Sequence, residues 1–262
     1  MKIQTFSSFI FDLDGVVYRG STPIKGAPQT IELLQKKKLD FFFLTNNATK
    51  TRYQYLRKLA KMGIHVKKNQ IYTAAYAVAK YLSDNGFKRV HVVGEYGLKK
   101  EISNFNISLS AASKAEAVAA ALDTNFTYKK MGDAANAVRK GAFFIAANLD
   151  PTNPVEDGFL PGSGAIVQSI ATAAERKPDM VVGKPNTLLL DDILAENSLS
   201  RKDTALVGDR LDTDILLANK RNIFSICVLT GSTSKAEISR SRGLYKPKAV
   251  INSITEVLRF VK

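Results

Sequence analysis

The sequence is poor in the side chains that bind soft metals or build disulfide frameworks. Its 262 residues include one cysteine and two histidines. A single cysteine, Cys227, excludes an internal disulfide, and its apolar neighbours predict a buried structural thiol in a reducing compartment. His65 and His91 are not spaced as paired metal ligands, so a histidine-based zinc or copper site is not expected.

Long apolar runs are missing as well. No run approaches the roughly 20 residues that cross a bilayer, and the start lacks a basic stretch followed by an apolar one. We therefore expect a cytoplasmic protein with no membrane partner. Internal repeats of solenoid length and low-complexity tracts are also absent from the sequence. A chain of 262 residues can form one large domain or two modest ones.

Positive charge is abundant but dispersed. The 38 basic and 24 acidic residues give a formal charge of +14. The basic side chains occur in short runs, at 36–38, 67–68, 99–100, 129–130 and 240–242. No zinc-finger spacing, RNA-binding aromatic signature or long basic tail accompanies them. The pattern predicts no specific nucleic-acid partner and favours a basic surface that attracts small anionic substrates.

Short apolar runs alternate with segments of helical periodicity. Strands are expected at 8–13, 40–46, 89–94, 141–148, 180–184, 204–209, 224–231 and 249–251. Helices are expected at 27–38, 52–63, 74–84, 128–141, 162–176, 186–198 and 212–222. The alanine-rich stretch 115–122 fits either a buried helix or a buried strand. This alternation predicts an α/β fold with parallel sheets covered by helices on both faces.

The middle of the chain differs from its ends. Between about residues 87 and 177 the apolar runs are shorter, and a loop at 147–164 contains three prolines and three glycines. A loop of this length in a compact domain is usually functional or marks a junction, and 175–180 reads as a second junction. The pattern predicts a core formed by residues 1–86 and 178–262, interrupted by a second domain at 87–177.

Two aspartates follow the first expected strand in the sequence FIFDLDGV. A turn or helix cap would explain one Asp-Gly pair, whereas a metal and phosphate site would explain both acids. Residues two apart on a strand point to the same side, so Asp12 and Asp14 could face one crevice. Three other strand ends also run into polar residues, namely Thr45-Asn46-Asn47, Gly183-Lys184-Pro185 and Gly208-Asp209-Arg210. In an open parallel sheet the ligand crevice lies at the carboxyl ends of the strands.

Such a crevice would gather carboxylates, a lysine and hydroxyl or amide donors. Carboxylates without histidine or cysteine suit a hard, oxygen-binding cation, Mg²⁺ in particular. A lysine and Thr or Asn donors beside Mg²⁺ would hold a phosphoryl group. The combination predicts phosphoryl transfer through an aspartate nucleophile. For Asp212 and Asp214 the alternative is a helix cap, which we favour for Asp212 and not for Asp214.

The strings DLDGVVYRG, FLTNNATKT, VVGKP and VGDRLDTDI closely resemble the haloacid dehalogenase (HAD) superfamily of phosphatases, and within it the NagD-like, or 4-nitrophenylphosphatase, branch. The resemblance spans nearly the whole chain. It implies a Rossmann-like core, with a parallel sheet flanked by helices, and an α/β cap domain inserted between the second and third motifs. It also implies that the cap can take part in homodimer contacts.

The resemblance assigns a role to each motif residue. Asp12 is implied as the nucleophile, Asp14 as the acid and then the base, and Lys184 as the cation that neutralises charge on both nucleophile and phosphate. Thr45 and the backbone amide of Asn46 are implied to hold phosphate oxygens. Mg²⁺ is implied to bind to Asp12, to the main-chain carbonyl of Asp14 and to Asp209, with Asp214 holding the waters of the metal.

The substrate is expected to be a small phosphorylated metabolite. Sugar phosphates, glycerol phosphate, phosphoglycolate, nucleoside monophosphates and p-nitrophenyl phosphate all remain open. Asn148 and Asp150 are the candidate substrate contacts, and local Asx-turns are the alternative. Ala147 stands where the branch commonly has threonine, which weakens any transfer of substrate identity. A phosphotransferase or mutase with the same nucleophile, and a non-catalytic polyanion-binding protein on the same fold, are the rival hypotheses.

Overall fold

A computed structural model describes residues 4–155 and 158–262. The chain forms two compact units, each assembled from separate stretches of sequence. The first unit contains the residues up to Thr45, Tyr55–Tyr72 and Lys184–Lys262, and the second contains Asn46–Gln54 and Thr73–Gly183. Among the described residues, none of the helices has the length and apolar character that crossing a membrane requires.

The first unit is built on a six-stranded sheet of order β15-β14-β13-β1-β4-β5. Its strands are β1 (Ser8–Phe11), β4 (Asp40–Thr45), β5 (Ile71–Thr73), β13 (Thr204–Gly208), β14 (Phe224–Val228) and β15 (Ala249–Ile251). The pairs from β15 to β4 are parallel. Every residue of β1 and of β13 is buried, as expected for strands covered on both faces.

Helices cover both faces of this sheet. The unit contains α1 (Ala27–Lys36), α2 (Arg52–Lys61) from Tyr55 onward, α7 (Leu188–Glu196), α8 (Leu216–Lys220) and α9 (Lys235–Arg240). Its shorter helices are η1 (Lys68–Gln70), η3 (Arg201–Asp203), η4 (Leu211–Ile215), η5 (Gly243–Tyr245) and η6 (Ile254–Phe260), and a small hairpin joins β2 (Tyr18–Arg19) to β3 (Thr22–Pro23). Alternate strand residues, among them Phe9, Phe11, Phe41 and Phe43, form one core with α1, α2 and η6.

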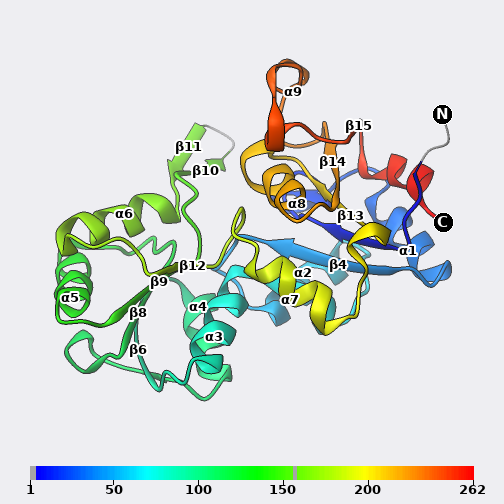
Figure 1. Ribbon diagram of the computed structural model, residues 1–262. Helices are drawn as coiled ribbons and strands as arrows, with labels where there is room; N and C mark the ends of the chain where they lie inside the picture. The colour runs from blue at the N-terminus through cyan, green and yellow to red at the C-terminus, as the bar shows by residue number, and fades with distance from the viewer. Residues whose placement is uncertain (1–3, 156–157) are drawn as a thin grey trace. The chain divides into compact units, whose positions relative to one another are not determined.

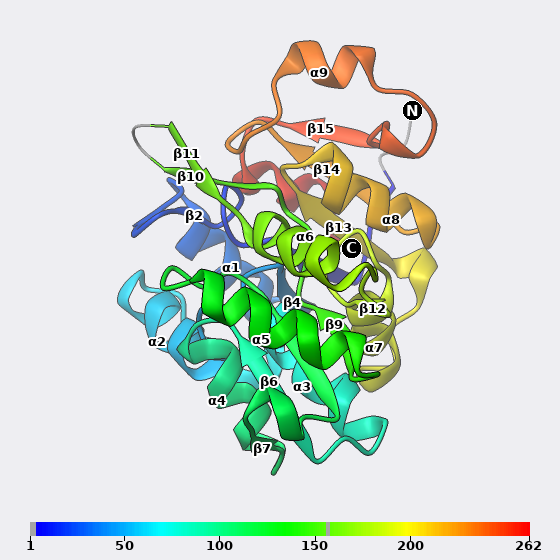
Figure 2. The same cartoon turned by 90° about the vertical axis from the view of Figure 1, so that its left-hand side faces the viewer.

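The second unit has its own parallel sheet, of order β12-β9-β8-β6-β7. The strands are β6 (Arg89–Val93), β7 (Ser108–Leu109), β8 (Ala117–Ala120), β9 (Phe143–Ala146) and β12 (Met180–Val181). Its helices are α3 (Ala74–Asp84), α4 (Tyr96–Asn104), η2 (Ala112–Lys114), α5 (Tyr128–Arg139) and α6 (Ser163–Ala174). Helices α5 and α6 lie on one face of the sheet and α3 and α4 on the other (Figures 1 and 2).

The predicted α/β class with helix-flanked parallel sheets is confirmed, and every expected strand and helix is present. The loop expected at 147–164 contains a two-stranded hairpin, β10 (Thr152–Val155) paired with β11 (Gly158–Pro161). Glu156 and Asp157, which also belong to that predicted loop, lie outside the described residues. Helices α4 and α9 were not expected. The alanine-rich stretch forms β8.

The boundaries of the compact units differ from those predicted for the domains. The second unit begins its main stretch at Thr73 and includes α3, which the prediction assigned to the core, and it also takes in 46–54. Its last strand, β12, pairs with β9 of the second sheet, whereas we expected residues 180–184 to form a core strand. Whether the second unit acts as a cap domain stays a prediction.

Candidate active site

The carboxyl ends of neighbouring parallel strands bring the first two motifs and the fourth together. Phe11 of β1 pairs with Phe43 of β4 and with Val207 of β13, so the three strands end at the same edge. Asp12 directly follows β1, and its backbone N–H donates to the carbonyl of Val207 at 2.9 Å. Thr45 is the last residue of β4, and Asp209 directly follows β13.

Three carboxylates converge at this edge. Asp12, Asp209 and Asp214 each offer an oxygen, and these oxygens all lie within 4.8 Å of one another. All three residues are buried. Oxygen donors at this spacing, with no nitrogen or sulfur donor among them, fit a hard divalent cation.

Lys184 lies among these acids. Its Nζ is 2.5 Å from Oδ1 of Asp12 and 2.6 Å from Oδ1 of Asp214, and it also donates to the carbonyl of Leu44 at 3.4 Å. We expected Lys184 at the end of a core strand, but it follows β12 of the second sheet and is the first residue of the chain's return to the first unit. Lys184 therefore lies beside the carboxylates as expected, but the strand before it belongs to the second sheet and not to the core sheet.

The charges of this cluster are not balanced, because one lysine accompanies three carboxylates. Burial raises the pKa of Asp12 well above its usual range, with Asp214 and Asp209 adding to the rise and Lys184 opposing it. Burial and the neighbouring Asp214 likewise raise the pKa of Asp209. Burial lowers the pKa of Lys184, but the neighbouring carboxylates of Asp12 and Asp214 raise it by more than burial lowers it. The net pKa is therefore above its ordinary value, and the ammonium keeps its proton. Additional positive charge at the cluster would lower the pKa values of these carboxylates and stabilise their ionised forms.

The π-helical turn after β13 positions Asp214. Its carboxylate accepts from the backbone N–H of Arg210 at 3.1 Å. A Cβ on Gly208 would lie 2.2 Å from the Cβ of Asp214, so only glycine permits this approach. We expected Asp212 to cap a helix, but its side chain makes no capping hydrogen bond. Its carboxylate pairs with the guanidinium of Arg210 at 2.8 Å, and that ion pair overcomes the effect of burial and lowers the pKa of Asp212.

The segment after β14 belongs to the same edge and was missed in the sequence. The backbone N–H and the hydroxyl of Ser232 donate to Oδ2 of Asp209 at 2.7 and 2.8 Å. A Cβ on Gly231 would lie 2.1 Å from the Cβ of Asp209. The sequence FSICVLTGS did carry a signal, because the expected strand at 224–231 runs into small polar residues like the other strand ends.

Asp14 is separate from the buried carboxylates. Strand β1 ends at Phe11, so neither aspartate lies within the strand and the alternation argument for a shared side does not apply. Asp12 is buried, whereas Asp14 is exposed. The side chain of Asp14 is not part of the three-acid cluster. The proposed metal contact through its main-chain carbonyl stays a prediction.

The remaining predicted residues lie together in the second unit. The side-chain amide of Asn46 donates to Oδ2 of Asp150 at 3.0 Å, and the amide of Asn148 donates to the carbonyl of Asn46 at 2.7 Å. Asn148 also accepts from the backbone N–H of Asp150 at 3.0 Å, which is the local Asx-turn considered as the alternative. The local Asx-turn is therefore present, and the role of Asn148 and Asp150 as substrate contacts stays a prediction.

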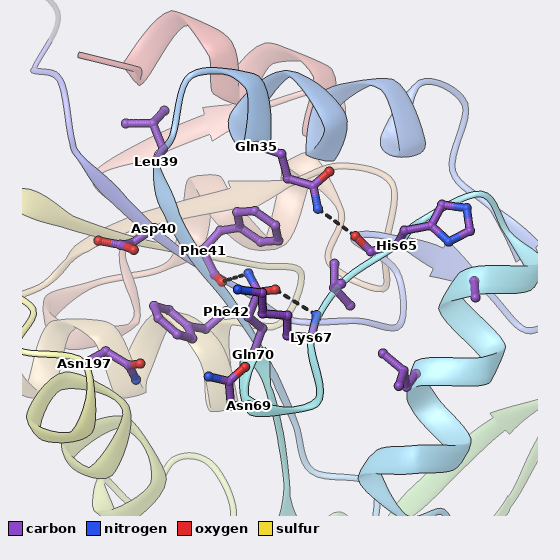
Figure 3. Close-up of a pocket in the computed structure, with 13 residues that line it drawn as sticks. Gln35, Leu39, Asp40, Phe41, Phe42, His65, Lys67, Asn69, Gln70 and Asn197 are labelled. Carbon is purple, nitrogen blue, oxygen red and sulfur yellow. Dashed lines mark hydrogen bonds between the residues drawn. The ribbon is translucent and has the colours of Figure 1, made fainter.

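A separate cavity of about 670 Å³ lies near the amino end of β4 (Figure 3). Gln35 donates to the carbonyl of His65 across it at 2.6 Å, and Gln70 donates to that of Phe41 at 3.0 Å. None of the predicted site residues lines this cavity. It is not part of the carboxylate cluster.

Two family models match the chain, and both describe the same superfamily. Residues 9–108 match a haloacid dehalogenase-like hydrolase model, and residues 181–257 match a second HAD-hydrolase-like model. The chain belongs to the haloacid dehalogenase-like hydrolases. The resemblance inferred from the four motifs is thereby confirmed.

Curated relatives extend the family match over almost the whole chain. An acid sugar phosphatase of Staphylococcus haemolyticus is 36% identical over 237 residues, covering 90% of each chain. Phosphoglycolate phosphatase 2 of Arabidopsis thaliana is 31% identical and covers 99% of this chain and 94% of its own. Both relatives are named phosphatases, which confirms the prediction of a HAD-type phosphatase.

Solved structures share the fold over nearly the full length. A 4-nitrophenylphosphatase of Thermotoga maritima has a TM-score of 0.92, is 32% identical and covers 98% of each chain. NagD of Escherichia coli K-12 has a TM-score of 0.88, is 29% identical and covers 97% of this chain and 98% of its own. A glycerol phosphate phosphatase of Mycobacterium tuberculosis in complex with magnesium has a TM-score of 0.89, is 30% identical and covers 98% of this chain and 78% of its own.

Proposed function

We propose that this protein is a Mg²⁺-dependent phosphatase that hydrolyses small phosphate monoesters through an aspartyl-phosphate intermediate. The observation that carries the proposal is the position of Asp12, which is buried beside Lys184 and within the cluster completed by Asp209 and Asp214. A buried carboxylate held by an ammonium, at the carboxyl edge of a parallel sheet, is suited to attack an electrophile placed in the crevice.

The two aspartates would share the reaction. An oxygen of Asp12 attacks phosphorus, and the bond between phosphorus and the ester oxygen breaks. Asp14 gives its proton to the leaving oxygen and then removes a proton from water, which attacks the aspartyl-phosphate and frees Asp12 and inorganic phosphate. The exposure of Asp14 supports this division, because a leaving group and a water both approach from solvent.

Phosphate oxygens would be held by donors around the nucleophile. Thr45 ends the strand next to β1 and offers a hydroxyl, and the backbone N–H of Asn46 follows it in the chain. Lys184 adds a positive charge that opposes the growing charge on the phosphoryl group. These donors bind a phosphoryl group without recognising the rest of the substrate.

Asp12 and Asp209 would hold Mg²⁺, together with the main-chain carbonyl of Asp14, and Asp214 would hold the waters of the metal. The donor set fits this ion, since it contains only oxygen and carries more negative charge than Lys184 neutralises. When bound, Mg²⁺ supplies charge neutralisation at the phosphoryl oxygens and the nucleophile. The magnesium complex of the Mycobacterium tuberculosis relative supports the choice of ion.

The leaving group would be recognised by the second unit acting as a cap domain, with Asn148 and Asp150 as contacts. The hydrogen bond between Asn46 and Asp150 supports this, because Asn46 immediately follows the phosphate-binding Thr45. Relatives named acid sugar phosphatase, phosphoglycolate phosphatase, 4-nitrophenylphosphatase and glycerol phosphate phosphatase favour a small phosphorylated metabolite as the substrate. Cytoplasmic localisation and homodimer formation stay predictions.

Phosphate release from p-nitrophenyl phosphate, measured with and without Mg²⁺, tests the proposal. We expect activity that requires the metal and that Asp12→Asn abolishes. Transfer of the phosphoryl group to an added alcohol in preference to water would favour the phosphotransferase. Inactivity of the wild type with Mg²⁺, joined to tight polyanion binding at physiological salt, would favour the non-catalytic alternative. A panel of phosphorylated metabolites compared by kcat/KM would then identify the substrate class.

A further inference from the structure

The turn that carries Asp14 is held by the segment that follows β14. Thr230 lies two residues beyond the end of that strand, in the same compact unit as Asp14. Its hydroxyl donates to the carbonyl of Gly15 at 2.7 Å, and its own carbonyl accepts from the Nε of Arg19 at 2.7 Å. One residue thus binds both ends of the stretch from Gly15 to Arg19.

Backbone hydrogen bonds define the shape of this turn. The N–H of Gly15 donates to the carbonyl of Tyr18 at 2.8 Å. The N–H groups of Val17 and Tyr18 donate to the carbonyl of Leu13 at 2.9 and 3.2 Å. Asp14 lies between Leu13 and Gly15, inside this set of bonds. A movement of Gly15 would therefore move the peptide group that joins it to Asp14.

Gly15 fits tightly against two other segments of the site. Its φ of 79° lies in the left-handed region, which glycine adopts without strain. A Cβ on Gly15 would lie 2.7 Å from Oδ2 of Asp209 and 2.9 Å from the Cα of Gly231. Gly231 directly follows Thr230 in the chain. The hydrogen bond from Thr230 therefore holds Gly15 where the turn meets both the loop after β14 and a proposed metal ligand.

The hydrogen bond from Thr230 to Gly15 is costly to lose. Gly15 is buried, and a buried carbonyl that loses its donor keeps the penalty of having left water. Threonine suits this role because its branched Cβ restricts the side chain to few rotamers. Asp14 is itself exposed, so the position of its carboxylate depends on the backbone that carries it.

We propose that Thr230 is a positioning residue for Asp14. Its two hydrogen bonds keep the turn in the conformation from which Asp14 gives its proton to the leaving oxygen. A general acid must lie within hydrogen-bond reach of the oxygen that it protonates, so a small displacement of the turn slows the step that needs the proton. This inference rests on the proposed function, because it takes Asp14 as the acid.

Steady-state kinetics of Thr230→Val on two substrates test this role. Valine keeps the branched shape of threonine and removes the hydroxyl. We expect kcat/KM to fall about 3- to 10-fold on an alkyl phosphate, the range for one lost hydrogen bond. On p-nitrophenyl phosphate, whose leaving group is stable as an anion, we expect a fall of less than about twofold. Thr230→Ser keeps the hydroxyl and should retain wild-type values on both substrates. Equal losses on the two substrates in Thr230→Val would overturn the inference.

Thr204→Val is the matched control. Thr204 begins β13, at the end of the strand opposite Asp209, and its hydroxyl also donates to a backbone carbonyl at 2.7 Å, that of Ser200. We expect this variant to lower the melting temperature and to leave the ratio of the two kcat/KM values unchanged. A ratio changed as much in Thr204→Val as in Thr230→Val would contradict a specific role. If Thr230→Val does not fold, Thr230→Ala removes the same hydroxyl and should show the same contrast.

A double-mutant cycle with Asp14 separates this inference from the proposed function. In an Asp14→Asn background, Thr230→Val should change kcat/KM on the alkyl phosphate less than about twofold, because the group that it positions no longer gives a proton. An undiminished effect in that background would overturn the inference alone. Equal losses on the two substrates in Asp14→Asn itself would remove Asp14 as the acid, and the inference with it. Absence of phosphate release by the wild type would overturn the proposed function.

Discussion

The ammonium of Lys184 lies 2.5 Å from the carboxylate of Asp12, and at most a tenth of either side chain is exposed. Asp12 directly follows the first strand, β1, and Lys184 lies where the chain returns from the second unit. An ion pair so far from water is costly to break, because the partner left behind keeps an uncompensated charge. Removing either member of the pair should therefore lower the free energy of unfolding.

We expect Lys184→Met to destabilise the protein by about 3–5 kcal/mol, because both Asp12 and Asp214 lose their cation. Denaturant unfolding of the metal-free protein measures this change. Lys36→Met is the matched control, since Lys36 forms an exposed pair with Glu32 that is worth at most about 1 kcal/mol. Similar stabilities for the two variants would show that Lys184 does not hold the cluster together.

Metal binding should depend on a residue that has no side chain. A Cβ at Gly231 would meet Asp209 at 2.1 Å and force its carboxylate to move. We expect Gly231→Ala to weaken Mg²⁺ binding about 10- to 100-fold, the usual cost of disturbing a group that supports a ligand. Calorimetric titration of the metal measures the loss.

Gly132→Ala provides the opposite control for that experiment. Gly132 lies within α5, and nothing is within 4 Å of the position of its Cβ. Alanine there should stabilise the protein by about 0.5–1 kcal/mol and leave Mg²⁺ affinity unchanged. Loss of metal affinity in both variants would point to a general effect of substitution rather than to Asp209.

The requirement for Asp14 should depend on the leaving group. We expect Asp14→Asn to lower kcat/KM strongly for an alkyl phosphate, whose leaving oxygen needs a proton, and less for p-nitrophenyl phosphate, whose leaving group is stable as an anion. Steady-state kinetics on both substrates measure the contrast. Equal losses on the two substrates would argue against Asp14 as the acid.

The stability of the second unit should fall in acid. The hydroxyl and backbone N–H of Thr124 donate to Glu95 and lower the pKa of that carboxyl below its ordinary value of 4.5. Because the folded-state pKa is the lower one, the stabilisation is complete above pH 4.5 and is lost as the pH falls through the folded pKa. Glu95→Gln should therefore differ from the wild type in melting temperature at pH 7 and not at strongly acidic pH.

Periodicity predicted most of the fold because the strands are continuous apolar runs and the helices have a clear apolar face. The prediction failed where one hydrophobic pattern is compatible with more than one secondary structure or with more than one sheet. The alanine-rich stretch that forms β8 has a sequence pattern that is equally compatible with a helix, and its pairing with β6 and β9 makes it a strand. Residues 180–184 read as one more parallel strand, and nothing local reveals which sheet β12 joins.

The proposed site was predictable where a motif coincides with the end of a strand, as at Asp12, Thr45 and Asp209. Residues that act through backbone atoms or through packing were not. Ser232 supports Asp209 with an N–H as well as a hydroxyl.

The central claim is that Asp12 carries the phosphoryl group. The most direct measurement is an acid quench of the enzyme within a single turnover of a phosphate ester labelled at phosphorus, followed by peptide mapping. We expect label on the peptide that contains Asp12 in the wild type and none in Asp12→Asn, which should also fail to hydrolyse the ester. Label on another residue, or hydrolysis that persists in Asp12→Asn, would contradict the claim.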